Sequence, residues 1–435
     1  MAIAISSQGF KRYFANTSWL MAERVFRMTV ALFVGVYVAR YLGPEKFGLL
    51  SYAVSFVGLY TALATLLGVN NIIVRELVKT PKRRDELLGT AFWLKTGSTI
   101  LVWIGIAAAI PFMHNDSQTN TMIIIIAFAV VFQAFNVIDI NYQAEVKSKY
   151  MVYAQFVQLA VSSVTKLVLI AIKAPLVYFA WVILADAVVL AVGLVAMYLK
   201  NTGKLWYWQW SWRTAKELLN DSWPLILSGI AITIYMKIDQ VMIKQMLGAE
   251  EVGFYAAAVR LSEAWYFIPM TITSSVFPSI INAKKQSEKL YYQRLQKLYN
   301  LMAWLAAAIA LPTTFLAPFV IKVMFGETFL PASGVLSIHV WAGVFVFLGV
   351  ACSKWFIVEN YIKKNLYRAA IGMVTNVVLN LILIPSYGIY GAAVATLIGH
   401  MTAALLYDIF DKDTYPSLKL KFNALNPFYI LRCLC

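Results

Sequence analysis

The sequence predicts an all-α integral membrane protein with about twelve transmembrane helices, in two duplicated six-helix lobes around a central cavity. Three observations predict this fold: a composition that is 61% hydrophobic and only 13% charged, long apolar runs joined by short basic connections, and a motif that recurs 205 positions later. A soluble domain carries about 45–50% apolar and about 25% charged residues. This chain therefore has too few polar side chains to cover a water-facing globule.

A helix that crosses the hydrocarbon core needs about 20 apolar residues. Runs of this kind here are apolar at odd and even positions alike, which indicates helices, because the strands of a membrane barrel alternate. We expect twelve spans, at 18–40, 47–69, 88–110, 120–139, 150–171, 176–198, 222–243, 253–276, 298–319, 333–357, 367–385 and 389–410.

Basic residues are distributed unevenly over the connections. With the N-terminus placed inside, the inner connections hold 25 of the 37 Lys and Arg residues and the outer connections hold five. Because basic residues accumulate on the cytoplasmic side of membrane proteins, we expect both termini in the cytoplasm. This bias accounts for most of the net charge of +16, so no nucleic-acid partner is expected.

A short motif appears twice, as LGPEKFG at 42–48 and as LGAEEVG at 247–253, with four of seven positions identical. Each copy lies at an outer connection, which predicts two six-helix lobes, at 1–217 and at 218–435 with a short cytoplasmic tail. An even number of helices in each lobe makes them a parallel repeat. Hinge or outer-gate candidates are Gly43, Gly48, Gly248 and Gly253; a simple helical hairpin turn is the alternative, and the more economical one.

Charges inside the apolar spans are the candidate functional residues, because each is costly in the bilayer unless it faces a cavity or a partner. Cations there can hold an anionic substrate by charge-assisted hydrogen bonds. The candidates for substrate binding are Arg24, Arg27, Lys95, Lys166, Lys237 and Arg260. The candidates for ion coupling are Glu23, Asp186, Asp239 and Glu263. The excess of cations over acids indicates an anionic ligand.

The alternative for these charges is a set of internal ion pairs that fix helix packing. Glu23 and Arg27, at i,i+4, and Arg260 and Glu263, at i,i+3, can pair on one helix face, and the two interpretations are balanced there. The cavity is favoured for Arg24, Lys95 and Lys166, which lack an obvious local partner.

No enzyme motif occurs in a convincing context, and neither a metal nor a cofactor is expected. His400 could carry a proton, although a packed histidine is the favoured interpretation. The aromatic and basic stretch 205–218 is typical of an interfacial anchor on the cytoplasmic leaflet. The basic stretch 284–297 has the same character, and a lipid head-group site is an alternative there.

The run IDQVMIKQMLGAEEVGFYAAAVRLSEAWYFIPMTITSSVFPSI, at 238–281, resembles the pattern of the Wzx-type polysaccharide-unit (O-antigen) flippases. That pattern reads D…LG…VG-x-Y-x-x-A…E…IP…FP. The stretches 39–52 and 68–76 resemble the opening of the same family, so the similarity covers nearly the whole chain. This family belongs to a superfamily that also holds multidrug exporters and lipid II flippases.

The resemblance implies a transporter and not an enzyme. Its members move an undecaprenyl-diphosphate-linked oligosaccharide from the cytoplasmic to the periplasmic leaflet of the bacterial inner membrane, by alternating access. The resemblance also implies coupling to H⁺ or Na⁺, with a polysaccharide polymerase and a chain-length regulator as protein partners. Two alternatives stay open: a cation-coupled multidrug or small-molecule antiporter, and a membrane glycosyltransferase that handles the same lipid.

Overall fold

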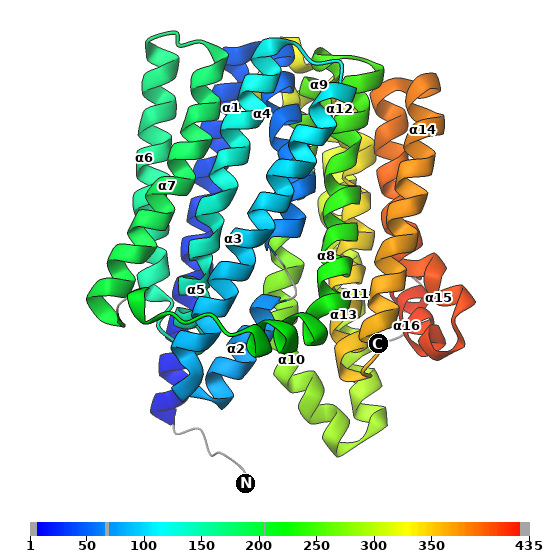
Figure 1. Cartoon of the computed structure of the whole chain (residues 1–435). Coiled ribbons are helices and arrows are strands. Elements are labelled where there is room, and N and C mark those ends of the chain that lie inside the picture. Colours follow the sequence, from blue (N-terminus) through cyan, green and yellow to red (C-terminus); the bar gives the residue numbers. More distant parts are fainter. Residues whose placement is uncertain (1–6, 66–68, 204, 427–435) are drawn as a thin grey trace. The chain divides into compact units, whose positions relative to one another are not determined.

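The computed structural model describes residues 7–65, 69–203 and 205–426, without the side chains of 7–23, 63, 65 and 71. Every regular element in these ranges is a helix, and the described residues contain no strand (Figure 1). The all-α class predicted from the sequence is therefore confirmed.

Ten helical stretches in the described ranges are long and apolar enough to cross a membrane. Two of them contain a break in the helical backbone. Gly43 (φ 71°, ψ 172°) interrupts α1 (Ser7–Thr65), and Gly388 (φ 60°, ψ −143°) interrupts α14 (Ile362–Met401). Glycine adopts such angles because it has no Cβ. Each break separates two predicted spans, so the ten stretches correspond to the twelve spans expected from the sequence.

The chain forms two compact units, each described here separately. The first contains the chain up to Val38 and the segments Leu63–Ala108 and Asn120–Ser222. Its packing is close enough that a Cβ on Gly193 would lie 3.1 Å from the Cβ of Ala154. Its helices are the first part of α1, α2 (Val69–Lys79), α3 (Arg84–Ala109), α4 (Ser117–Phe132), α5 (Val137–Ala144), α6 (Lys149–Ala171) and α7 (Leu176–Asn201), with 3₁₀ turns η1 (Pro81–Arg83), η3 (Gln133–Asn136) and η4 (Leu205–Tyr207).

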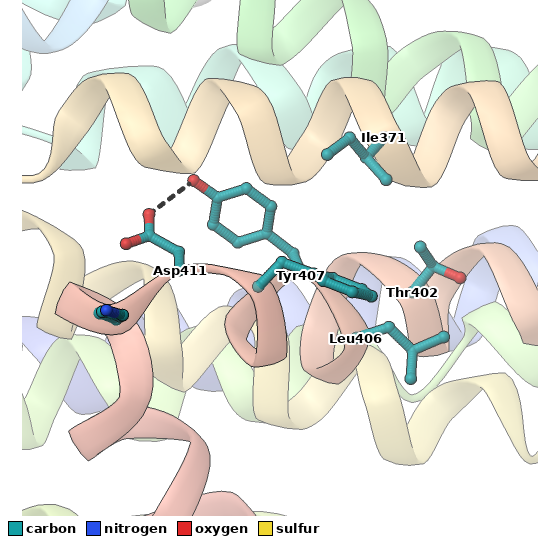
Figure 2. Close-up of a pocket in the computed structure, with 7 residues that line it drawn as sticks. Ile371, Thr402, Leu406, Tyr407 and Asp411 are labelled. Carbon is teal, nitrogen blue, oxygen red and sulfur yellow. Dashed lines mark hydrogen bonds between the residues drawn. The ribbon is translucent and has the colours of Figure 1, made fainter.

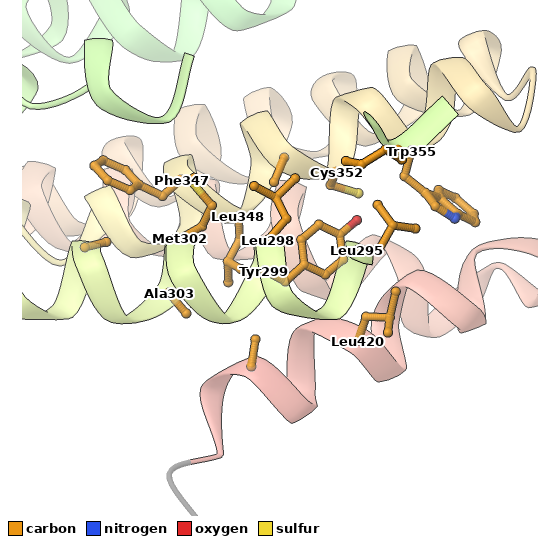
Figure 3. Packing of buried hydrophobic residues seen from close by; sticks show 14 of the residues in the cluster. Leu295, Leu298, Tyr299, Met302, Ala303, Phe347, Leu348, Cys352, Trp355 and Leu420 are labelled. Atoms are coloured by element: carbon orange, nitrogen blue, oxygen red, sulfur yellow. The ribbon is translucent and has the colours of Figure 1, made fainter. Parts of the chain in front are cut away.

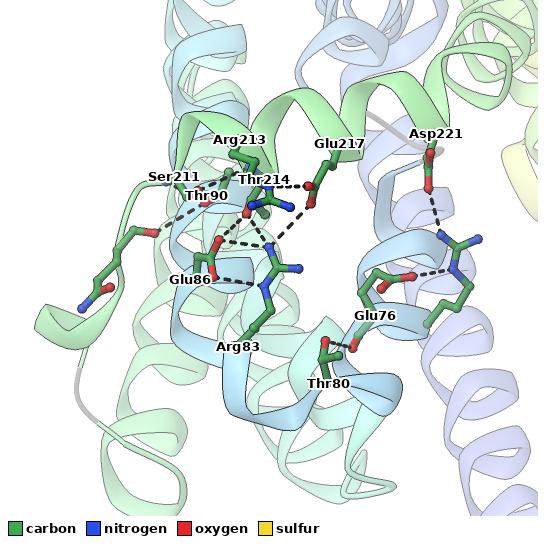
Figure 4. Close-up of polar contacts among 12 residues, drawn as sticks. Glu76, Thr80, Arg83, Glu86, Thr90, Ser211, Arg213, Thr214, Glu217 and Asp221 are labelled. Carbon is green, nitrogen blue, oxygen red and sulfur yellow. Dashed lines mark hydrogen bonds and ion pairs between the residues drawn. The ribbon is translucent and has the colours of Figure 1, made fainter.

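The linker after α7 is bound to the start of α3 through its backbone (Figure 4). The amide of Ser211 donates to Thr90 Oγ1 at 3.1 Å, and a Cβ on Gly89 would lie 2.6 Å from the Gln209 amide nitrogen. Trp208 packs on Phe92 with ring centroids 5.5 Å apart. Part of the predicted interfacial anchor is therefore packed against protein, because small residues on α3 let the linker approach.

Other aromatic residues of the linker point away from this contact. Trp206 and Trp212 are about three-quarters exposed, as an interfacial anchor requires. Arg83 contacts side chains of two different helices (Figure 4). Glu86 of α3 lies at 3.1 Å, and on α8 Thr214 Oγ1 lies at 2.8 Å and Glu217 at 3.6 Å. This polar cluster fixes the start of α8 to α3.

The second unit contains Ala39–Ala62, Ala109–Thr119 and the chain from Trp223 onward. Its main boundary lies close to the predicted lobe boundary at 217, but two segments of the first half pack with it. Its helices are the rest of α1, α8 (Trp212–Met246), α9 (Ala249–Glu263), α10 (Phe267–Gln286), α11 (Glu288–Phe325), α12 (Ala332–His339), α13 (Ala342–Val358), α14, α15 (Tyr407–Phe410) and α16 (Tyr415–Leu425), with η2 (Ile110–Phe112), η5 (Glu327–Phe329), the π-helix η6 (Thr402–Leu406) and η7 (Lys412–Thr414). The division into duplicated lobes stays a prediction.

The core of the second unit lies where α11, α13 and α16 meet (Figure 3). Tyr299, Phe347 and Trp355 are almost completely buried in it. Nearby, the fully buried Lys421 donates to Asp408 Oδ2 at 2.5 Å and to the carbonyl oxygen of Ala404 at 2.7 Å. The buried positive charge is thus paired, and the pair holds α16 against the end of the last span.

A pocket of about 420 Å³ lies beside η6 and is lined by residues that include Ile371, Leu406 and Tyr407 (Figure 2). Tyr407 donates to Asp411 Oδ2 at 3.0 Å, and Lys364 Nζ donates to Asp411 Oδ1 at 2.7 Å. Burial alone would raise the pKa of Asp411, but these hydrogen bonds outweigh it and hold the pKa below its usual range. The carboxylate therefore stays ionised and fixes the end of α15.

Candidate functional site

The two copies of the repeated motif lie against each other in the second unit. A Cβ on Gly48 would clash with the carbonyl oxygen of Ala249 and would lie 2.8 Å from the Gly253 amide nitrogen. A Cβ on Gly253 would clash in turn with the carbonyl oxygen of Pro44. The second glycine of each copy thus meets the third residue of the other copy. We call this contact the glycine crossing.

The first glycine of each copy has a different task. Gly43 has a φ of 71° and Gly248 a φ of 115°, so both lie in the left-handed region where a helix ends and the chain turns. The turn that the sequence predicts is present at both copies. The close approach at the glycine crossing could not be predicted from it, and the gate role of Gly43, Gly48, Gly248 and Gly253 stays a prediction.

In the first unit, a carboxylate that the sequence analysis did not select lies near two candidate cations. Lys95 is 5% exposed on α3, and Asp139 on α5 interacts electrostatically with Lys95 and with Arg27. Asp139 was overlooked because it falls at the end of a predicted span, where a charge needs no explanation. Arg24 is exposed and has no partner among the described residues, and the side chain of Glu23 lies outside them. Asp139 therefore lies in the electrostatic field of two of the candidate cations.

Lys166 has a partner that the sequence did not indicate. Its Nζ donates to Ser162 Oγ at 2.6 Å and to Asp186 Oδ2 at 3.3 Å, and Ser162 Oγ donates to the same carboxylate oxygen at 2.8 Å. The expectation that Lys166 lacks a nearby partner is wrong, because Asp186 reaches it from the neighbouring helix α7. A role for this pair in substrate binding or ion coupling stays a prediction.

We expect Lys166→Met to have a smaller effect on transport than Lys95→Met. Asp186 already compensates the charge of Lys166, so this lysine has less positive charge to offer an anionic substrate than the unpaired Lys95 has. Thermal unfolding and surface-glycan complementation of both variants measure this. Equal loss of transport in the two would restore Lys166 to the substrate-binding set.

The second unit contains a buried carboxylate that no cation of the described residues neutralises. Asp239 on α8 is 2% exposed, and its oxygens accept hydrogen bonds from neutral groups only. Tyr255 donates at 2.6 Å, Asn380 Nδ2 at 2.6 Å, and Thr396 Oγ1 also donates. Asn376 Oδ1 accepts from Asn380 at 3.2 Å and completes the set, which we call the Asp239 cluster.

One oxygen of the Asp239 cluster is unsatisfied. Asn380 Oδ1 is buried and has no hydrogen-bond partner among the described residues, and the single hydroxyl hydrogen of Thr396 is shared between Asp239 and the carbonyl oxygen of Ala392, at 3.0 Å. Carboxylate, amide and carbonyl oxygens are the ligands that hard cations take. One sequence signal could have found the cluster: Asn376 and Asn380 are spaced i,i+4 within an apolar span, and so lie on one helix face.

Three other candidate charges lie apart from this cluster or at its edge. Glu263 interacts electrostatically with Lys237 and with Asp239. Arg260 does not pair with Glu263 among the described residues; its guanidinium lies 5.4 Å from the ring centroid of Phe47. The i,i+3 ion pair considered from the sequence is therefore absent in this part of the chain.

The two span histidines are packed against side chains. His339 Nδ1 lies 2.7 Å from Ser262 Oγ, and the His400 ring lies edge-on to Tyr235 with centroids 4.9 Å apart. This is the packing that the favoured interpretation of His400 describes.

Comparison with known proteins gives the family. The model of the family described as "Polysaccharide biosynthesis protein" matches residues 13–284, more than half of the chain. The chain belongs to this family. The MatE family model also matches this chain, at residues 224–382. The resemblance seen in the sequence is thereby confirmed at the level of the family and its superfamily.

Two relatives of this chain have informative names. A Shigella flexneri protein named as an O-antigen transporter is 22% identical over 420 residues, which cover 90% of this chain and 96% of that protein. Agl15 of Haloferax volcanii, named as a probable low-salt glycan biosynthesis flippase, is 24% identical over 49% of this chain and only 46% of its own length.

Two solved structures share the fold of this chain. A multidrug resistance MATE family transporter in an inward-facing conformation has a TM-score of 0.74 at 16% identity, covering 91% of this chain and 95% of that one. The lipid II flippase MurJ, in an inward closed conformation, has a TM-score of 0.71 at 14% identity, covering 95% and 92%. At these identities the likeness concerns the fold alone.

Proposed function

We propose that the protein is a flippase which moves an undecaprenyl-diphosphate-linked oligosaccharide from the cytoplasmic to the periplasmic leaflet of the bacterial inner membrane. The observation that carries the proposal is the buried Lys95 of α3 in a member of the polysaccharide biosynthesis family. Lys95 is 5% exposed, forms no ion pair with the described residues and interacts with Asp139 only through longer-range electrostatics. Its positive charge inside an apolar helix suits an anionic substrate.

The substrate's chemistry explains why such a protein is needed. A diphosphate and a row of sugar hydroxyls lose their hydration in roughly 30 Å of hydrocarbon, which prevents unaided crossing. Lysine and arginine inside the membrane compensate the phosphate charge with charge-assisted hydrogen bonds. The polyprenyl tail can remain in lipid throughout. We place both termini in the cytoplasm, as the distribution of basic residues indicates.

We propose the Asp239 cluster as the coupling site for H⁺ or Na⁺. A buried carboxylate without a cation is costly, so a bound ion or proton lowers the free energy of the state that holds it. The unpartnered Asn380 Oδ1 adds one more ligand beside Asp239. Binding of the ion here would favour one conformation of α8 relative to α14, which is how a gradient drives alternating access.

We propose that the glycine crossing closes the periplasmic side while substrate enters from the cytoplasm. The contact leaves no room for even one methyl group, so nothing can pass between the two backbones at this point while it is formed. A polymerase and a chain-length regulator would receive the product on that side.

The experiment that tests the function is complementation of surface glycan in a strain that lacks its own flippase. We expect Arg24→Ala and Lys95→Met each to reduce glycan display at least about tenfold, since a charged hydrogen bond contributes about 1.5–3 kcal/mol. Lys364→Gln, which removes an ion-paired cation at the start of α14, is the matched control and should retain display.

The multidrug antiporter is the second candidate, because the MatE model matches 224–382. Proteoliposomes discriminate between the two. Translocation of a fluorescent lipid-linked glycan supports the flippase, while ion-driven movement of cationic dyes without any lipid-linked glycan activity supports the antiporter and contradicts the proposal.

A further inference from the structure

A buried arginine near the start of α14 has no acidic partner. Arg368 is 7% exposed and lies six residues beyond Ile362, about 9 Å along the helix. Counting charges along the sequence places Arg368 in an inner connection, so it was not among the intramembrane candidates. The structure places it inside the helical part of the second unit instead.

The side chain of Arg368 is held in one position by neutral groups. Its Nη2 donates to Asn365 Oδ1 at 2.9 Å, to Ser353 Oγ at 3.0 Å and to the carbonyl oxygen of Gly349 at 3.4 Å. Its guanidinium carbon lies 5.1 Å from the ring centroid of Phe356. These neutral groups orient the guanidinium but do not neutralise its charge.

The other terminal nitrogen of Arg368 is unused. Nη1 is buried and has no hydrogen-bond partner, and no carboxylate of the described residues lies within 4.0 Å of the side chain. The contrast with Lys421 is informative, because that buried cation has Asp408 at 2.5 Å. An unpaired buried charge is among the costliest features of a protein interior, so its retention indicates a ligand.

A second cation lies on the adjoining helix. Lys354, next to Ser353 on α13, is partly buried with its Nζ 5.2 Å from the ring centroid of Phe277, and it has no acidic partner among the described residues either. Arg368 on α14 and Lys354 on α13 are therefore two cations that form no ion pair with the described residues.

We propose that Arg368 is a binding residue for an anionic phosphoryl group, with Lys354 adding to the local positive potential. The free edge at Nη1 suits a phosphate oxygen, since guanidinium binds phosphate through directed N–H groups. This inference rests on the proposed function, and it assigns to the second unit a phosphate subsite separate from the cations around Asp139.

Asn365, which accepts a hydrogen bond from Arg368, is itself held only weakly by α8. Its Nδ2 lies 3.5 Å from Ser228 Oγ, which is a long hydrogen bond.

The test measures binding to the full-length protein in nanodiscs, with undecaprenyl diphosphate, undecaprenol and inorganic diphosphate as probes. We expect Arg368→Gln to weaken undecaprenyl diphosphate binding about 10–150-fold, the equivalent of one lost charged hydrogen bond. Arg368→Lys should lose less, because the charge remains. Lys364→Gln, four residues earlier on the same helix and ion-paired, should bind as the native protein does.

The outcomes distinguish a lipid-linked phosphate from a free one. They also distinguish a binding role of Arg368 from a purely structural role. Arg368-dependent binding of undecaprenyl diphosphate alone supports the proposal with the lipid-linked source; equal dependence with inorganic diphosphate supports a phosphate site and contradicts the proposed substrate. Unchanged binding in Arg368→Gln, with an equal or higher unfolding temperature, means that Nη1 merely holds water and overturns the inference, while native translocation leaves the proposed function standing. If Arg368→Gln does not fold, Arg368→Lys and Lys354→Gln supply the same comparison.

Discussion

Gly48→Ala is expected to destabilise the protein by about 1–3 kcal/mol and to abolish glycan display, although it adds a single methyl group. The new Cβ would have to occupy the position of the Ala249 carbonyl oxygen, so α1 and α9 must separate. Backbone cannot move aside as a flexible side chain can. Gly253→Ala should behave in the same way, because its Cβ meets the carbonyl of Pro44. Thermal unfolding of the purified protein and surface-glycan complementation measure the two effects.

Gly58→Ala is the matched control for this prediction. Gly58 lies on the same helix, and the nearest atom to its added Cβ is Lys237 Cγ at 3.9 Å, an ordinary contact. Alanine is a better helix former than glycine by up to about 1 kcal/mol, so this variant should be as stable as the native protein or more so. If Gly48→Ala and Gly58→Ala unfold at the same temperature, the glycine crossing is not a close contact.

Asp239→Asn is expected to remove ion dependence from transport while the fold survives. The amide keeps the shape of the carboxylate but loses its charge, and with it the attraction for a proton or Na⁺. Loss of a buried charge that lacks a cation should leave stability unchanged or increase it. Translocation by proteoliposomes with an imposed H⁺ or Na⁺ gradient measures the effect, and we expect at least about a tenfold loss of gradient-driven rate.

Two further variants make this prediction specific. Asp116→Asn removes an exposed carboxylate outside the cluster and should have no effect on transport. Asn380→Ala removes the unpartnered Oδ1 and one donor to Asp239, so it should weaken coupling while the carboxylate remains. Gradient-driven transport at the native rate in Asp239→Asn would contradict the assignment of coupling to this cluster.

The membrane segments could be predicted from the sequence because they depend on composition and length, which are local properties. Even the two places where structure merges spans, at Gly43 and Gly388, lie where the sequence predicts a connection. The charges were harder to interpret, because their partners lie on other helices. The Lys166–Asp186 pair joins α6 to α7 over 20 positions, and nothing in a helix's own spacing shows which face its neighbour will present.

Residues at the margins of predicted spans were the hardest to assign. Asp139 and Arg368 both lie where a span was expected to end or begin, and a charge at an interface is ordinary. Arg368 is the second residue of the span expected at 367–385, but α14 begins at Ile362, so Arg368 lies nearly two turns inside the helix. A shift of a few residues in a helix boundary thus separates an interfacial charge from a buried one.

The glycine crossing also bears on how the chain arose. The pairing of the two motif copies is reciprocal: Gly48 of the first copy meets Ala249 of the second, and Gly253 of the second copy meets Pro44 of the first. Reciprocal contacts of this kind occur at isologous dimer interfaces. In a half-length ancestor, one gene would have supplied both sides, and any change at the third motif position would have occurred twice in the assembly. Under the predicted duplication, fusion would have removed that constraint and allowed Pro44 in one copy and Ala249 in the other. Gly48 and Gly253 would have remained under it, because each faces a carbonyl oxygen that leaves no space for a side chain.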